Sequence, residues 1–155
     1  MDEKIIKDNK GYVLEGFTHL ASSHRKLHND RRKYEWKVIF SVITFYVLIV
    51  SAFYTGDIDF NNGPILMIII PLIFAWLAII SIFFLRKLHI ANSKNMRIAE
   101  YSERNINNLI NDKEVDFIKL KDIRPEPNWW AFSWQITSII TFAAIASVLV
   151  ILTLK

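Results

Sequence analysis

The chain has 155 residues, of which 52% are hydrophobic and 22% are charged, with a formal net charge of +4. The hydrophobic share exceeds that of ordinary soluble domains, and it is concentrated in three long runs, which excludes a typical soluble globular protein. The chain contains no cysteine, which excludes disulfides, thiol catalysis and thiolate metal sites.

Residues 1–35 are predicted to form an N-terminal segment with a polar end and an amphipathic helix at about 12–35. Side chains on one face of this helix recur in steps of four and three. The members of this face are Val13, Phe17, Leu20, His24, Leu27, Arg31 and Tyr34. An apolar face needs a partner, which is the other polar segment, a neighbouring subunit or the lipid surface.

Residues 36–54 are predicted to be transmembrane helix 1, and 55–63 the loop that follows it. The run Val38–Tyr54 carries no charge and is close to the shortest length that crosses a bilayer as a helix. Because lipid offers no hydrogen bonds, each backbone polar group must be satisfied within its own helix or in a closed barrel. Uninterrupted apolar runs do not fit the alternating pattern of barrel strands.

Residues 64–85 are predicted to be transmembrane helix 2, kinked at Pro71. The segment 86–128 follows, and its first part reads as a helix to about Asn111 that could continue directly from the span. The stretch 115–123 is compatible with a short strand, an interfacial turn or a helix. The two prolines in 124–127 then stop any helix.

Residues 129–155 are predicted to be transmembrane helix 3, with Asn128 as its N-cap. This run is uncharged but contains polar and small side chains, which in bilayers mediate helix–helix contacts. The candidates for helix packing or pore lining are Gln135, Ser138, Thr141, Ala143 and Ser147. We expect packing rather than pore lining from them.

Basic residues precede the first run and follow the second, whereas the loop 55–63 has no Lys or Arg and contains Asp57 and Asp59. The positive-inside rule therefore places the N-terminus and 86–128 in the cytoplasm and the C-terminus outside. Tryptophan prefers the membrane interface. The predicted anchors at the cytoplasmic interface are Trp36, Trp129, Trp130 and Trp134. We predict a multi-pass protein of a prokaryotic plasma membrane.

Few residues suggest chemistry. His24 and His28 share a helix face, but the sequence between them lacks the glutamate of a zinc-peptidase motif. No arginine has a histidine at the spacing of Arg-x4-His nucleases, and Asp57 and Asp59 resemble a solvated turn. We predict no cofactor, metal site or catalytic residue. Because the spans lack charge, an ion-coupled transporter is also not expected.

The predicted fold class is an all-α integral membrane protein with three transmembrane helices and two helical cytoplasmic segments. The predicted function is non-enzymatic and acts by self-association or partner binding, with an oligomeric pore-forming or membrane-perturbing effector as the sharper version. One alternative is an accessory subunit of a larger membrane complex. Another is a membrane-bound enzyme, for which the only candidate residues are His19, His24, His28, Asp116 and Glu126.

The predicted partners are the lipid bilayer and either a second copy of the chain or a membrane or cytoplasmic protein. Nucleic acid is not expected, because acidic residues nearly balance the basic ones between 86 and 128.

Overall fold

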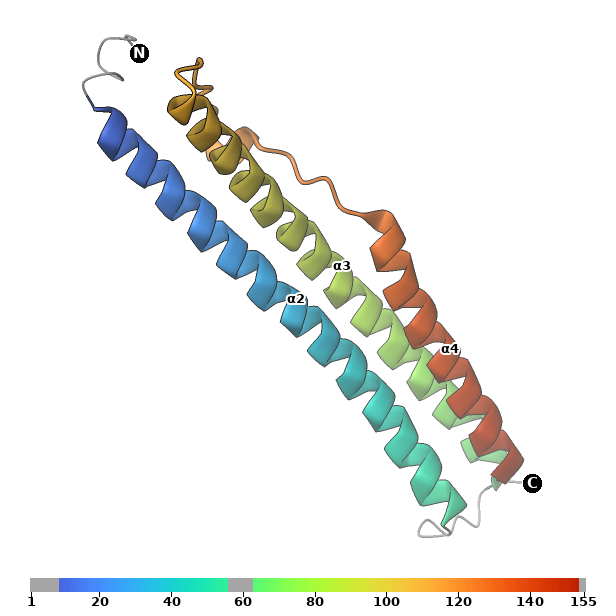
Figure 1. Cartoon of the computed structure of the whole chain (residues 1–155). Coiled ribbons are helices and arrows are strands. Elements are labelled where there is room, and N and C mark those ends of the chain that lie inside the picture. The colour runs from blue at the N-terminus through green and yellow to red at the C-terminus, as the bar shows by residue number, and fades with distance from the viewer. Residues whose placement is uncertain (1–8, 56–62, 154–155) are drawn as a thin grey trace. The chain divides into compact units, whose positions relative to one another are not determined.

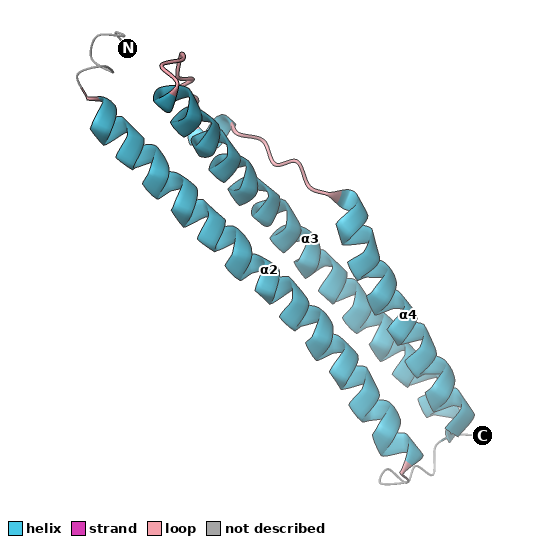
Figure 2. Cartoon of the chain, in the orientation of Figure 1, coloured by secondary structure: helices cyan, strands magenta, loops and turns pink. Residues whose placement is uncertain are grey.

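The computed structural model describes residues 9–55 and 63–153, and every regular element within them is helical (Figure 2). The elements are α2 (Lys10–Tyr54), α3 (Gly63–Ile110), a short 3₁₀ helix η1 (Leu120–Asp122) and α4 (Trp129–Thr153). Helices α2, α3 and α4 are each long and apolar enough to cross a membrane. The described part of the chain is therefore all-helical, with three helices that suit a multi-pass membrane protein.

The amphipathic N-terminal helix and the first apolar run form one continuous helix, α2, and the second apolar run continues through the following polar segment as α3. Pro71 lies inside α3 without ending it. The ambiguous stretch 115–123 is irregular apart from η1. Asn128 caps α4 as predicted, since its Oδ1 accepts a hydrogen bond from the backbone N–H of Ala131 at 3.3 Å.

The chain divides into two compact units, to both of which α2 and α3 contribute. Unit 1 consists of Met1–Lys33 and His89–Pro127, and unit 2 consists of Tyr34–Leu88 and Asn128–Lys155. Each unit has its own hydrophobic cluster.

In unit 2, α2, α3 and α4 lie side by side and share a narrow core (Figure 1). Tyr46 of α2 and Phe74 of α3 are its largest fully buried side chains, with ring centroids 4.9 Å apart. The Tyr46 hydroxyl donates a hydrogen bond to the Phe74 carbonyl oxygen at 3.1 Å, which satisfies the polar end of this buried ring. Ile139 and Val150 complete the core from α4.

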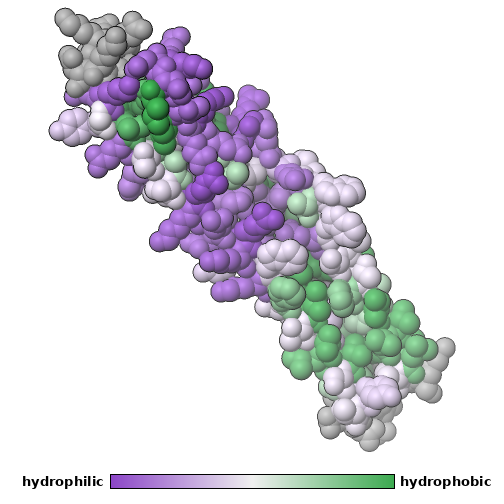
Figure 3. Space-filling model, viewed as in Figure 1, coloured by the Kyte–Doolittle hydropathy of each residue, from purple (hydrophilic) through white to green (hydrophobic). Residues whose placement is uncertain are grey.

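The visible outer surface of unit 2 is mostly apolar (Figure 3). Large side chains such as Leu48, Trp76 and Ile140 are more than half exposed. A continuous apolar exterior of this kind would be unfavourable in water, and it is the surface that a bilayer solvates. The core and the exterior of unit 2 therefore both fit three helices embedded in lipid.

Unit 1 has the opposite character, with a polar visible surface around a small apolar cluster (Figure 3). Phe17 of α2 and Tyr101 of α3 meet edge to face at 6.1 Å between centroids, and Leu109 of α3 joins them. Phe117, from the segment after α3, packs on the other side of Phe17 at 6.0 Å. The two polar helices thus bury their apolar stripes against each other.

Two members of the predicted stripe on α2, Leu27 and Tyr34, are wrong by one residue, whereas His24 and Arg31 are half-buried as expected. Leu27 and Tyr34 are 44% and 58% exposed, whereas His28 is half-buried and Glu35 is 3% exposed. Steps of three and four residues from Phe17 can pass through Leu27 and Tyr34 or through His28 and Glu35. Hydrophobicity favoured Leu27 and Tyr34. Polar partners decide the second, since His28 Nδ1 lies 3.3 Å from the carbonyl oxygen of Asn92 on α3.

Replacement of Phe17 by alanine is expected to destabilise unit 1 by roughly 3 kcal/mol, because it removes the ring that joins α2, α3 and Phe117. Hydrogen exchange of the amides in 89–127 should accelerate in the detergent-solubilised protein. Tyr12→Ala is the control, since Tyr12 is 79% exposed. Equal protection in Phe17→Ala and wild type would contradict this role of Phe17.

Candidate functional site

Polar residues of the described chain form three clusters within the units: a buried seam between α2 and α3 in unit 1, a groove in unit 1, and one polar pair in unit 2. The first two are built by the same stretch of α3, residues 92–105, which presents its amides inward and its arginines toward the groove.

The seam of unit 1 uses histidines and amides where a soluble helix pair would use leucines. His24 Nδ1 lies 3.2 Å from Asn95 Oδ1, and His28 Nδ1 lies close to the Asn92 carbonyl. The two histidines do share a face, as predicted, and each is engaged with α3. Among the described residues, no group of three or more His, Cys, Asp or Glu side chains could hold a metal ion.

Arg25 of α2 and Glu103 of α3 join the two helices at the edge of the seam. The guanidinium donates two hydrogen bonds to the carboxylate, from Nε at 2.7 Å and from Nη2 at 2.6 Å. Both side chains are nearly half exposed, so the pair contributes at most about 1 kcal/mol to stability. Its two-pronged geometry serves mainly to set the register of α2 against α3.

Residues 111–127, here called the strap, run back along α3 and are held there by Tyr101 and Asn105. The Tyr101 hydroxyl accepts a hydrogen bond from the Ile118 N–H at 2.9 Å and donates one to the Asp116 carbonyl oxygen. The Asn105 amide, which is fully buried, both donates to the Asp116 carbonyl oxygen at 2.8 Å and accepts from its N–H at 3.3 Å. These hydrogen bonds fix an irregular segment, whose Val115, Phe117 and Ile123 also pack on unit 1.

The sequence alone assigns no partner to Tyr101 or Asn105. The signal was an asparagine in a helix interior, where its propensity is poor and where a side-chain partner compensates. The partner itself, an irregular backbone segment, has no pattern that sequence reasoning can detect.

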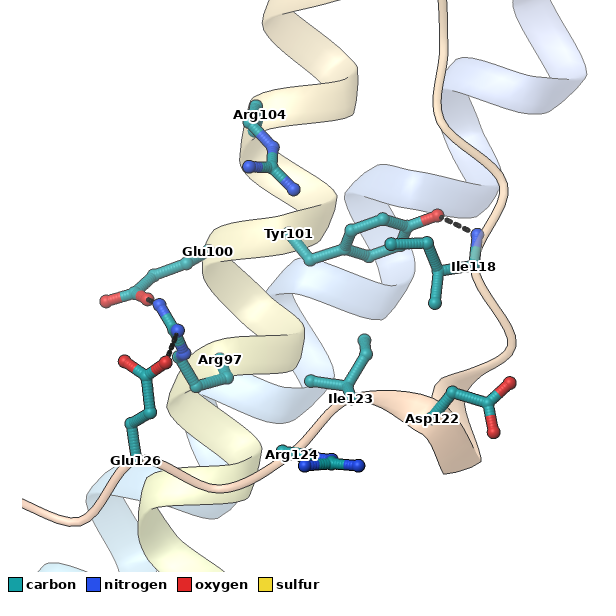
Figure 4. Close-up of a pocket in the computed structure, with 9 residues that line it drawn as sticks. All are labelled: Arg97, Glu100, Tyr101, Arg104, Ile118, Asp122, Ile123, Arg124 and Glu126. Atoms are coloured by element: carbon teal, nitrogen blue, oxygen red, sulfur yellow. Dashed lines mark hydrogen bonds and ion pairs between the residues drawn. The ribbon is translucent and has the colours of Figure 1, made fainter.

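The groove of unit 1 lies between α3 and the strap and has a volume of about 410 Å³ (Figure 4). Its floor is formed by the Tyr101 ring, Ile118 and Ile123, and charged side chains surround it. These charged residues are Arg97, Glu100, Arg104, Asp122, Arg124 and Glu126.

Arg97 lies between Glu100 and Glu126 and forms ion pairs with both (Figure 4). Arg104 and Arg124 line the same groove and make no ion pair with any described residue. A guanidinium without a carboxylate partner is able to bind a carboxylate or phosphate oxygen with two parallel hydrogen bonds. The groove therefore has the chemistry to receive an acidic group, although its formal charges balance.

The polar pair of unit 2 consists of Glu35 and Gln135. Gln135 Nε2 donates a hydrogen bond to Glu35 Oε2 at 3.3 Å, and the residues are 9% and 3% exposed, respectively. The sequence indicated Gln135 as a packing candidate but not Glu35. Glu35 precedes the apolar run and was therefore assigned to the polar part of the helix. The clue was its position directly before Trp36, at the expected membrane interface.

The polar and small candidates of the third span do not share one face. Gln135 and Ala143 are buried inside unit 2, and the hydroxyls of Ser138 and Ser147 donate to carbonyls of their own helix, those of Trp134 and Ala143. Thr141 alone among them is exposed.

The four predicted interface tryptophans are all exposed, from 48% for Trp36 to 73% for Trp130. Trp129 and Trp134 lie between these values, at 51% and 59%.

The candidate residues of the predicted membrane-bound enzyme have different surroundings. His19 is exposed, Asp116 engages α3 through its backbone, and Glu126 pairs with Arg97. Asp57 and Asp59 lie outside the described residues.

No family model, curated protein or solved structure matches this chain. Function therefore has to be inferred from the residues and geometry of the chain itself.

Tyr101→Phe removes the hydroxyl that holds the strap at two backbone positions, and we expect a loss of about 1–3 kcal/mol in strap stability. Limited proteolysis of the solubilised protein should then cleave within 111–127 faster than in wild type. Tyr12→Phe is the matched control. Unchanged cleavage in Tyr101→Phe would contradict this account of the strap.

Gln135→Leu removes a hydrogen-bond donor from the buried Glu35 carboxylate, and we expect a destabilisation of about 1–3 kcal/mol. The double variant Glu35→Leu/Gln135→Leu should recover part of this loss, because it removes both partners. Thermal unfolding followed by circular dichroism, analysed as a double-mutant cycle, measures the coupling. Strictly additive effects would rule out a coupled pair.

Proposed function

We propose that this chain is a small, non-enzymatic integral membrane protein that acts by associating with further copies of itself. In this proposal unit 2 is the membrane-embedded part and unit 1 lies in the cytoplasm, the side to which the basic segments assign it. The proposal rests on a row of small and hydroxyl-bearing side chains on the exposed side of α4.

This row, here called the outer stripe, is formed by the exposed side chains of Ser133, Thr137, Thr141 and Ala144. The Ser133 hydroxyl donates to the carbonyl of Trp130 at 2.7 Å. The hydroxyls of Thr137 and Thr141 have no hydrogen-bond partner among the described residues. Hydroxyls that face lipid without a partner gain free energy when a second helix supplies one, and small side chains let that helix approach closely.

The outer stripe is not the set of third-span residues that the sequence predicted for helix packing or pore lining. Gln135 bonds Glu35 of α2 and Ala143 belongs to the core of unit 2, so both are already engaged. The predicted pore would need Gln135, Ser138 and Thr141 turned to one lumen, whereas Gln135 is buried against Glu35 and the Ser138 hydroxyl bonds its own helix. Self-association without a pore is therefore the form of the proposal that this geometry supports best.

The test is energy transfer between copies in lipid vesicles. The chain has no cysteine, so Lys26→Cys, at an exposed position of unit 1, gives one site for a donor or an acceptor dye. We expect transfer that exceeds random proximity and persists on dilution with lipid. Thr137→Leu/Thr141→Leu should weaken the association about tenfold, since each lost interhelical contact of this type is worth roughly 0.6–1.7 kcal/mol.

Ala75→Leu/Ile79→Leu is the matched control, because both residues are exposed on α3 outside the stripe. Ser41→Leu/Thr44→Leu tests the exposed hydroxyls of α2 in the same way. Transfer no greater than random proximity in wild type would overturn the proposal. Transfer that all three variants leave unchanged would remove the outer stripe as the contact.

A further inference from the structure

Three exposed cations lie at one end of unit 2. Lys37 is in the first turns of the unit 2 part of α2, and Arg86 and Lys87 are in the last turns of the unit 2 part of α3. Because α2 and α3 run in opposite directions in unit 2, these positions belong to the same end (Figure 1). The start of α4 belongs there too, since Gln135 bonds Glu35.

No exposed carboxylate of the described part of unit 2 balances these cations. Its only acidic residue is Glu35, which is 3% exposed and accepts a hydrogen bond from Gln135. Arg86 and Lys87 make no ion pair with any described residue, and Lys37 Nζ lies 5.3 Å from the centre of the Tyr34 ring. The positive charge therefore faces outward.

The same end carries four exposed indoles, one on α2 and three on α4. Trp36 stacks on Phe40 at 5.8 Å, and Trp130 meets Trp134 edge to face at 6.2 Å. Indole rings settle at the depth of lipid headgroups, where the apolar body and the N–H are both solvated. Long basic side chains beside them extend their charged ends to the phosphates. The indoles thus place the cations at phosphate depth.

We propose that this end of unit 2, here called the basic belt (Lys37, Arg86, Lys87 with Trp36, Trp129, Trp130 and Trp134), selectively binds anionic phospholipid headgroups. A zwitterionic headgroup brings its own cation, which three uncompensated charges repel. An anionic headgroup brings only the phosphate, and Arg86 can bind it with two parallel hydrogen bonds. The chain then resides in lipid enriched in negative charge.

The inference is independent of the outer stripe, because it concerns the lipid next to the belt and holds for a monomer as well as for an oligomer. Each basic residue at an anionic surface contributes roughly fivefold in affinity. The preference should weaken as salt rises, because exposed charges are screened.

The test uses the full chain in phosphatidylcholine vesicles that contain brominated phosphatidylglycerol or, in parallel, brominated phosphatidylcholine. Bromine quenches tryptophan fluorescence at close range, so the two titrations yield the relative affinity for the two headgroups. We expect wild type to prefer phosphatidylglycerol by about fivefold or more. Lys37→Gln/Arg86→Gln/Lys87→Gln should reduce this ratio to near one.

Two further variants separate the belt from net charge and from misfolding. Lys113→Gln/Lys119→Gln/Lys121→Gln removes the same charge from the strap of unit 1 and should keep the preference. Lys37→Arg/Arg86→Lys/Lys87→Arg keeps the charge of the belt and should also keep it. A wild-type ratio near one would overturn the proposal, as would an equal loss in the strap variant. Retained energy transfer between copies in either case would leave self-association intact.

Discussion

The structure depends on one constraint, which is that the backbone of a chain in lipid must satisfy its own hydrogen bonds. A helix meets this constraint at every residue, and three apolar helices long enough to cross a bilayer result. Since α2 and α3 contain no helix-ending signal where apolar sequence gives way to charged sequence, each continues as a single helix. The polar parts of α2 and α3 are therefore helical because they continue the helices that contain the spans.

Each unit is stabilised internally by a different kind of interaction. Unit 2 packs Tyr46, Phe74 and Ile139 against one another, and in lipid this packing is favoured by van der Waals contact rather than by the hydrophobic effect. Unit 1 has only a small apolar cluster and relies on amide and imidazole groups that pair across the seam. Such polar contacts contribute little net free energy, but they penalise a shifted register because a buried group would lose its partner.

The two proposals for this chain, self-association and binding of anionic lipid, both rest on surfaces. The outer stripe of α4, the groove beside Arg104 and the basic belt each lie on the outside of a unit. Their chemistry is that of recognition: hydroxyls for a neighbouring helix, free guanidiniums for an acidic group, and cations with indoles for lipid headgroups. Self-association in an anionic membrane combines the first and the last of these without requiring any chemical step.

The sequence by itself determined the class of fold, the three spans and the N-cap at Asn128, because length, hydropathy and capping are local properties that a single chain pattern records. It also indicated the four tryptophans that the structure leaves exposed and the polar side chains of the third span. Only the tertiary structure decided which face of each helix is used. It turned Gln135 inward to Glu35, left Thr137 and Thr141 outward, and exchanged Leu27 for His28 on the seam. These choices depend on which groups the other helices present, and the sequence of one helix does not specify those groups.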